Sequence, residues 1–200
     1  MMLDYTPQAV PRAAKKDYTP QQRQAFRTPN TPDQPVLMLA AYALGGAIDV
    51  DCTADDALSV PAKLHITAAC DFLRPVLTAV EGEVCRWNDG GNAAFMNPPF
   101  GNPKPFVERL LQAHQLGVID SSIMLLKSGC IHNKGTGTLI RNHSQAVCFW
   151  GAGKASRLAF LDHEGEQVVG ADFDCIFVYT GLDRYRFAGI FQDYGTVLML

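Results

Sequence analysis

One short stretch of the chain, Asn97-Pro98-Pro99-Phe100, combines residue types that can hold a planar amino group. A residue before proline is confined to extended backbone and proline has no N–H, so this stretch forms a stiff turn. The side-chain oxygen of Asn97 and the carbonyl of Pro98 then become two hydrogen-bond acceptors in a nearly fixed relation. Phe100 adds a flat apolar face beside them. We therefore interpret this tetrad as a site for an amino group on a planar ring.

A buried strand is expected to deliver the tetrad. The run Ala93–Met96 is short and wholly apolar, as in a strand that is covered on both faces. After Gly101, the segment 105–115 has the apolar spacing of an amphipathic helix. The segment 118–126 contains the next buried strand. The tetrad thus lies between a strand and the helix that follows it.

The rest of the chain also alternates predicted helices and strands. Val36–Leu44 is apolar nearly all round and predicts a buried helix that stops at Gly45-Gly46. The later elements are a short helix at 135–141, strands at 146–150 and 175–179, a helix at 184–192 and a strand at 196–200. This order predicts an α/β fold with a single-domain, Rossmann-like sheet, mostly parallel with an antiparallel edge. Residues 1–35 are predicted as a partly extended N-terminal arm, and 36–200 as the folded domain.

A second polar residue is expected close to the tetrad. The segment Ala47–Val50 predicts a short strand with Asp49 near its end. Ligands of open α/β sheets bind beyond the carboxyl ends of the strands, so Asp49 and Asn97 would face one crevice if their strands are parallel neighbours. The alternative for Asp49 is a cap or turn residue. The segment 51–70 has both turn residues and a possible helix and stays ambiguous.

The composition describes one ordinary globular domain. The 200 residues are 48% hydrophobic and 18% charged. No apolar run approaches the roughly 18 residues of a membrane span, and the N-terminal region has no apolar signal segment. The six cysteines are scattered among mostly apolar neighbours and predict reduced core thiols, with a disulfide framework or zinc as the alternative. We predict a cytoplasmic protein with no membrane segment and no metal.

The net charge of −3 conceals an uneven distribution. Between residues 45 and 95 there are eight acids and three bases, which gives −5. Between residues 127 and 157 there are five basic residues and no acid, which gives +5. These five are Lys127, Lys134, Arg141, Lys154 and Arg157. One part is suited to a cation and the other to a polyanion; the alternative is a solvated surface with uneven charge.

The stretch 95–102 resembles motif IV of amino-group DNA methyltransferases, which reads Asp/Asn/Ser-Pro-Pro-aromatic. The wider chain, from about 27 to 198, is similar to the phage-type (Dam-like) DNA N6-adenine methyltransferases. It has Thr28-Pro29 or Thr31-Pro32, then a hydrophobic helix, then Ile48-Asp49-Val50, in the order of that family. Asp71-Phe72 and the elements beyond the tetrad continue this order.

The resemblance implies S-adenosylmethionine as the methyl donor and an adenine flipped out of DNA as the acceptor. Asn97 and Pro98 would bind the two hydrogens of the adenine amino group and favour a nitrogen aimed at the methyl. Pro99 would keep the turn stiff. Phe100 would stack on the base, which can be worth ~1–3 kcal/mol. Residues 36–200 would then form the methyltransferase catalytic domain.

The resemblance also implies contacts for the donor and for DNA. Thr28 and Pro29 would lie near the methionine part of the donor, and Asp49 near its amino group. Asp71 would accept from its adenine amino group beside Phe72, although an Asp here can also cap a turn. The five basic residues named above would contact DNA phosphates, and for Lys127 the alternative is a side chain that extends to solvent.

One departure from the family pattern leaves alternatives open. After the predicted first strand a glycine-rich turn is usual, but here the segment reads Asp51-Cys52-Thr53-Ala54. A catalytically dead DNA-binding protein on a methyltransferase fold is therefore one alternative. Another keeps the donor and places the acceptor nitrogen in RNA or in a protein glutamine. The sequence does not favour a zinc deaminase, because neither His-x-Glu nor Pro-Cys-x-x-Cys occurs.

Overall fold

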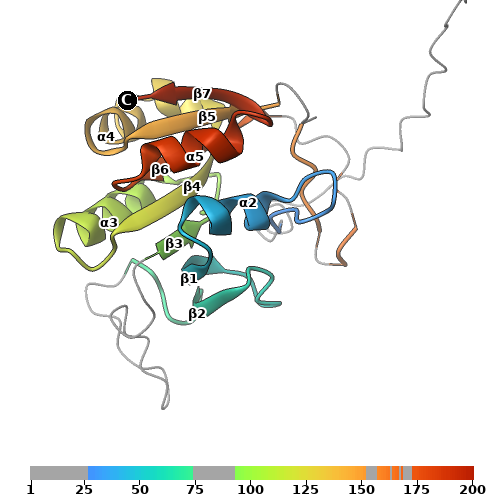
Figure 1. Cartoon of the computed structure of the whole chain (residues 1–200). Coiled ribbons are helices and arrows are strands. Elements are labelled where there is room, and N and C mark those ends of the chain that lie inside the picture. Colours follow the sequence, from blue (N-terminus) through green and yellow to red (C-terminus); the bar gives the residue numbers. More distant parts are fainter. Residues whose placement is uncertain (1–26, 74–92, 152–156, 163, 167, 169–172) are drawn as a thin grey trace, which may run out of the picture.

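The computed structural model describes residues 27–73, 93–151, 157–162, 164–166, 168 and 173–200. A seven-stranded sheet with the order β2-β1-β3-β4-β6-β5-β7 runs through this part of the chain (Figure 1). In chain order its strands are β1 (Ile48–Ala54), β2 (Ala62–Thr67), β3 (Ala93–Met96), β4 (Ser121–Lys127), β5 (Ala146–Trp150), β6 (Cys175–Thr180) and β7 (Gly195–Met199). The helices are α2 (Val36–Ala43), α3 (Lys104–Gln115), the 3-10 helix η2 (Ser128–His132), α4 (Thr136–His143) and α5 (Arg184–Phe191).

The sheet has a parallel half and an antiparallel half. Strands β2, β1, β3 and β4 pair in parallel. The pairs β4–β6, β6–β5 and β5–β7 are all antiparallel. The prediction of an α/β sheet is confirmed, but the antiparallel part is half of the pairings and not a single edge. Because β6 lies between β4 and β5 and is antiparallel to both, β5 runs in the same direction as β4.

Helices cover both faces of the sheet. Helices α2 and α5 pack on one face and lie in front of the sheet in Figure 1, while α3 and α4 pack on the other. Strand β3 shows how one short strand serves both layers, since successive strand residues point to opposite faces. Phe95 belongs to the core under α2 and α5, and Ala94 and Met96 belong to the core under α3 and α4.

Most predicted elements are confirmed, and the main error lies at β1. The strand predicted at 47–50 continues to Ala54, and the ambiguous segment that follows it contains a second strand, β2. Both were obscured by polar residues inside the strands. β1 carries Asp51 and Thr53 in its second half, and β2 is an edge strand with Lys63 and mostly half-buried side chains.

The connections create a crevice beside β1. The chain passes from β1 to β2 on one side and then to β3 on the other side of β1, and all three strands are parallel. Such a reversal of strand order opens a crevice at the carboxyl ends of the two central strands, which is where ligands of open α/β sheets bind. The fold therefore directs attention to the ends of β1 and β3.

The predicted arm is described only from residue 27, so residues 1–26 lie outside the described part. The described end of the arm packs on the domain. Arg27 pairs with Leu161 through two backbone hydrogen bonds, and the side-chain amide of Gln34 bonds to the backbone of Arg157 and Ala159. Residues 27–35 thus contribute to the same body as the sheet.

Three further observations bear on the predictions from composition. Within the described ranges, no helix is long and apolar enough to cross a membrane. The five cysteines of those ranges are free thiols, and Cys52, Cys148 and Cys175 are buried. No group of three or more potential metal ligands gathers in the described part of the chain.

The junction of η2 and α4 depends on a glycine. A Cβ on Gly137 would overlap the backbone carbonyl of Ile131, which also accepts a hydrogen bond from Arg141 at 2.6 Å. We expect Gly137→Ala to lower the free energy of unfolding by ~1–3 kcal/mol, the usual cost of overpacking. The control is Gly189→Ala in α5, where a Cβ meets nothing within 4 Å and should stabilise by ~0.5–1 kcal/mol. Denaturant unfolding measures both; an equal effect of the two changes would contradict the expectation.

Candidate functional site

A cavity of about 420 Å³ opens at the carboxyl ends of β1, β2 and β3. This volume lies within the usual range of small-ligand pockets, and the position is the crevice that the strand order creates. Its lining combines carboxylates, hydroxyls and aromatic rings. The residues are Thr28, Asp51, Cys52, Thr53, Ala54, Asp55, Asp56, Val60, Ile66, Thr67, Ala68, Asp71, Phe72, Asn97, Pro99 and Phe106.

Two hydroxyl groups fix Asn97 at this cavity. The backbone N–H of Asn97 donates to the Thr53 hydroxyl at 2.9 Å. Its side-chain Nδ2 donates to the Thr28 hydroxyl at 3.1 Å. The first bond holds the backbone of Asn97 and the second orients its side-chain amide, and no described residue donates to its Oδ1. Asn97 therefore lies beside the cavity with its side-chain oxygen available as an acceptor.

Of the other residues of the tetrad, Pro98 and Phe100 do not line the cavity. Pro99 lines the cavity. Pro98 is buried, and its carbonyl accepts no hydrogen bond from the described residues. Phe100 is half-buried and packs edge to face with Phe160 and Phe173, at centroid distances of 5.5 and 5.0 Å. The predicted aromatic face thus belongs to a rigid aromatic cluster at the carboxyl end of the sheet.

Asp51 is the most perturbed acid of the cavity, and the sequence did not single it out. Its side chain is 2% exposed, and burial raises its pKa from 3.8 to about 7. The Thr53 N–H, at 3.1 Å, and the nearby His65 oppose this rise only in part. Buried carboxylates without a cation are costly and concentrate at functional sites. The alternation Asp49, Asp51, Thr53 along an extended strand was the signal that could have revealed it.

The prediction for Asp49 rested on a wrong strand end. Because β1 continues to Ala54, Asp49 lies at the amino end of the strand and does not line the cavity. Its carboxylate pairs with Lys63 at 2.6 Å and accepts the Ala93 N–H at 3.1 Å. Asp49 therefore joins the beginnings of β1, β2 and β3. The structure places Asp51, two residues later, where the sequence expected Asp49.

Asp71 and Phe72 do line the cavity, on the side of β2. Asp71 has a positive φ of 52° and accepts the Leu73 N–H at 3.2 Å, so it closes a turn as the alternative interpretation held. The buried ring of Phe72 lies parallel to that of Phe106, with centroids 6.1 Å apart. The two rings form an apolar wall suited to a planar group, and Phe106 was not predicted.

Of the two Thr-Pro pairs, the first lies at the site. Thr28 is buried, lines the cavity and contacts Asn97. The adjacent Pro29 is buried but does not line the cavity. The hydroxyl of Thr31 instead accepts the Gln34 N–H and closes a turn.

The structure separates the five predicted DNA contacts. Arg141 is held by the Ile131 carbonyl and the Thr138 hydroxyl, and Arg157 pairs with Asp174 at 3.1 Å. Lys154 lies outside the described residues. Lys134 is exposed, and Lys127 lies over the rings of Phe173 and Phe100, with its Nζ 4.4 and 5.7 Å from their centroids. Of these five residues, only Lys127 and Lys134 lie in the described ranges and have neither a hydrogen bond nor an ion pair from their charged group to another described residue.

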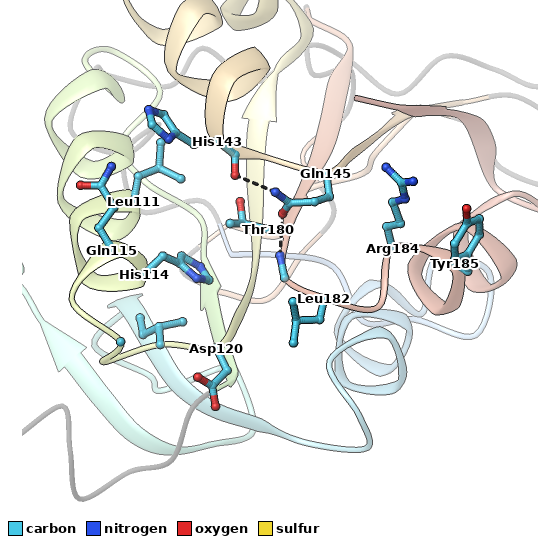
Figure 2. Close-up of a pocket in the computed structure, with 13 residues that line it drawn as sticks. Leu111, His114, Gln115, Asp120, His143, Gln145, Thr180, Leu182, Arg184 and Tyr185 are labelled. Carbon is cyan, nitrogen blue, oxygen red and sulfur yellow. Dashed lines mark hydrogen bonds between the residues drawn. The ribbon is translucent and has the colours of Figure 1, made fainter.

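A second cavity, of about 940 Å³, lies beside the amino ends of β4 and β5 and the carboxyl end of β6 (Figure 2). Its polar groups are largely bonded to one another. Gln145 donates to the His143 carbonyl at 3.1 Å and accepts the Gly181 N–H at 2.8 Å. His114 shares a hydrogen bond of 2.8 Å with the buried Ser122, and burial lowers the pKa of this histidine to about 4. These groups hold neighbouring segments together, so the larger cavity is the weaker candidate for chemistry.

Comparison with protein-family models, curated proteins and solved structures finds no match to this chain. The residues of the first cavity and its rim are therefore the basis for the proposed function.

Proposed function

We propose that the protein is a DNA adenine-N6 methyltransferase that uses S-adenosylmethionine. The observation that carries the proposal is the orientation of Asn97, whose amide nitrogen is held by Thr28 while its oxygen stays available beside the cavity. An oriented acceptor followed by the Pro98 carbonyl, which accepts no hydrogen bond from the described residues, suits the two hydrogens of a planar amino group.

The cavity supports the choice of donor. S-adenosylmethionine supplies an electrophilic methyl on a positively charged sulfur, and it also carries an ammonium group and an adenine ring. Asp51 and Asp56 would hold the positive charge, since both are carboxylates of the lining. The parallel rings of Phe72 and Phe106 would hold the adenine, with Asp71 beside them.

The residues of the tetrad account for the activation of the acceptor. The nitrogen of an adenine amino group is a poor nucleophile, because its lone pair is delocalised into the ring. Asn97 Oδ1 and the Pro98 carbonyl accept its two hydrogens and favour a pyramidal nitrogen, so their bonds strengthen towards the transition state. Bound S-adenosylmethionine would supply the methyl carbon to this nitrogen with loss of its carbon–sulfur bond, leaving S-adenosylhomocysteine, and the nitrogen would release a proton to water. Holding the adenine amino group and the donor methyl close together in the right orientation supplies much of the remaining rate acceleration.

The aromatic cluster supports a flipped base as the acceptor. Phe100 is wedged against Phe160 and Phe173, so its ring is held in place before any ligand arrives. A fixed ring stacks on a base at little cost in conformational entropy. An enzyme that acts on a base must first remove it from the duplex, which costs a few kcal/mol. Stacking on Phe100 would offset part of this cost.

The test is mass spectrometry of nucleosides from unmethylated DNA incubated with the protein and S-adenosylmethionine. We expect N6-methyladenine well above the level in reactions without protein. Calorimetry with the donor accompanies the assay. Donor binding without N6-methyladenine would refute the proposed acceptor, and parallel reactions with RNA would show whether another base is used. Absence of donor binding would refute the proposed donor and favour a non-catalytic protein.

Thr28 is expected to act through Asn97. In Thr28→Val the amide loses its partner and can rotate, so we expect kcat to fall about tenfold or more, a larger factor than any change in KM for the donor, whose cavity Thr28 also lines. Thr28→Ser keeps the hydroxyl and should restore most of the rate. Steady-state methyl transfer measures both variants; equal losses in the valine and serine variants would contradict an orienting role of the hydroxyl.

A further inference from the structure

The residues at the carboxyl ends of the strands form an acidic part and a basic part, with the tetrad between them. Asp51, Asp55, Asp56 and Asp71 line the cavity on the side of β1 and β2. On the other side, β4 ends at Lys127, and the segment that follows it contains Lys134. The charge of the side chains thus changes from negative to positive across Asn97.

A third lysine, which the sequence analysis did not select, joins the basic part. Lys104 begins α3, and the carbon atoms of its side chain lie 3.2 Å from where a Cβ on Gly135 would be. The Lys104 side chain therefore packs against the residue next to Lys134. Its ion pair with Glu108, at 3.3 Å, is solvent-exposed on both sides, and such pairs contribute little and yield readily to another anion.

The position of these lysines relative to the tetrad is set by the strand ends. Lys104 is four residues beyond Phe100, at the carboxyl side of β3. Lys127 is the last residue of β4, the parallel neighbour of β3, and its ammonium group lies over Phe100 and Phe173. A phosphate chain that delivers a base to Phe100 would therefore run past all three lysines.

We propose that Lys104, Lys127 and Lys134 form a binding track for the phosphate backbone of the nucleic acid whose base enters the site. This inference rests on the proposed function. It assigns the electrostatic contact to one side of the tetrad, and it excludes Arg141, whose guanidinium group donates to the Ile131 carbonyl and the Thr138 hydroxyl. The track contacts phosphates only, so it binds without regard to base sequence.

The test is the salt dependence of binding to a short labelled DNA duplex of mixed sequence. The slope of log Kobs against log salt concentration is negative, and each lost phosphate contact reduces its magnitude by about 1. We therefore expect a loss of about one unit of slope in Lys104→Gln and in Lys134→Gln, and several-fold weaker binding at low salt. The affinity for S-adenosylmethionine should stay unchanged, which shows that the variants are folded.

The matched control is Arg184→Gln, which removes one half-buried charge at the start of α5, beside the second cavity (Figure 2). It should leave the slope unchanged. An unchanged slope in both lysine variants, an equal change in Arg184→Gln, or no binding of DNA by the wild-type protein would overturn the track. Normal slopes in the lysine variants of an active methyltransferase would refute the track alone. Salt-dependent binding lost in these variants, without any methylation, would support the track and refute the proposed enzyme.

Discussion

Replacing Asn97 by alanine should abolish methyl transfer while the donor still binds. The substitution removes the acceptor Oδ1, whose bond is expected to strengthen only as the adenine nitrogen attacks. Removal of one such transition-state contact typically costs ~10²–10³ in kcat. The donor is expected to lie against Asp51 and the rings of Phe72 and Phe106, whereas the side chain of Asn97 bonds to Thr28. Single-turnover methyl transfer and calorimetry with the donor measure the two effects separately.

Asn97→Asp is the control for this experiment. It keeps an oxygen acceptor at the same position, and the Thr28 hydroxyl, now 3.1 Å from the amide nitrogen, can donate to a carboxylate oxygen there. We expect this variant to keep clearly more activity than Asn97→Ala. If the alanine variant loses donor binding in parallel with activity, Asn97 is part of the donor pocket and not the acceptor of the reacting amino group.

The local elements were predictable where hydrophobicity and turn residues agreed. Strand β3 is a pure apolar run that ends at a double proline, and α3 has one apolar face bounded by Pro105 and Gly117. Sheet order was not predictable in the same way, because it depends on pairing between distant segments. The antiparallel insertion of β6 between β4 and β5 joins residues more than 25 positions apart, for which no local pattern exists.

Only those parts of the site that depend on the local backbone could be predicted from the sequence. The tetrad constrains its own turn, so the sequence alone placed an acceptor at Asn97. The identity of the buried acid depended on where β1 ends, and a shift of that end exchanged Asp49 for Asp51. The charge count over 127–157 likewise could not reveal that Arg141 and Arg157 are held by partners within the protein.

Replacing Asp51 by asparagine should weaken donor binding and stabilise the fold at the same time. The folded protein holds a proton at Asp51 up to a pKa of about 7, whereas the unfolded chain releases it near 3.8. The contribution of this group to stability is therefore present in full below about pH 4 and is lost as the pH rises to 7. The loss is at most about 4 kcal/mol, since one pKa unit corresponds to about 1.4 kcal/mol. Asparagine stays neutral at every pH, so the Asp51→Asn variant does not lose this stability as the pH rises.

We therefore expect Asp51→Asn to unfold at a higher temperature than the wild type at about pH 8, and this difference to shrink as the pH falls towards 5. Its affinity for S-adenosylmethionine should fall about tenfold or more, because a positive charge loses its buried partner. Thermal unfolding at several pH values and calorimetry with the donor measure the two effects.

Asp49→Asn is the matched control, since it makes the same change two residues earlier in β1. Asp49 is paired with Lys63 at the far end of the strand, so its replacement should leave donor affinity unchanged and give no gain in stability at alkaline pH. The reverse result, with donor binding lost in Asp49→Asn and kept in Asp51→Asn, would show that the donor binds at the amino ends of the strands. A buried acid that costs stability and improves only binding is what selection for function, not for folding, would retain at this position.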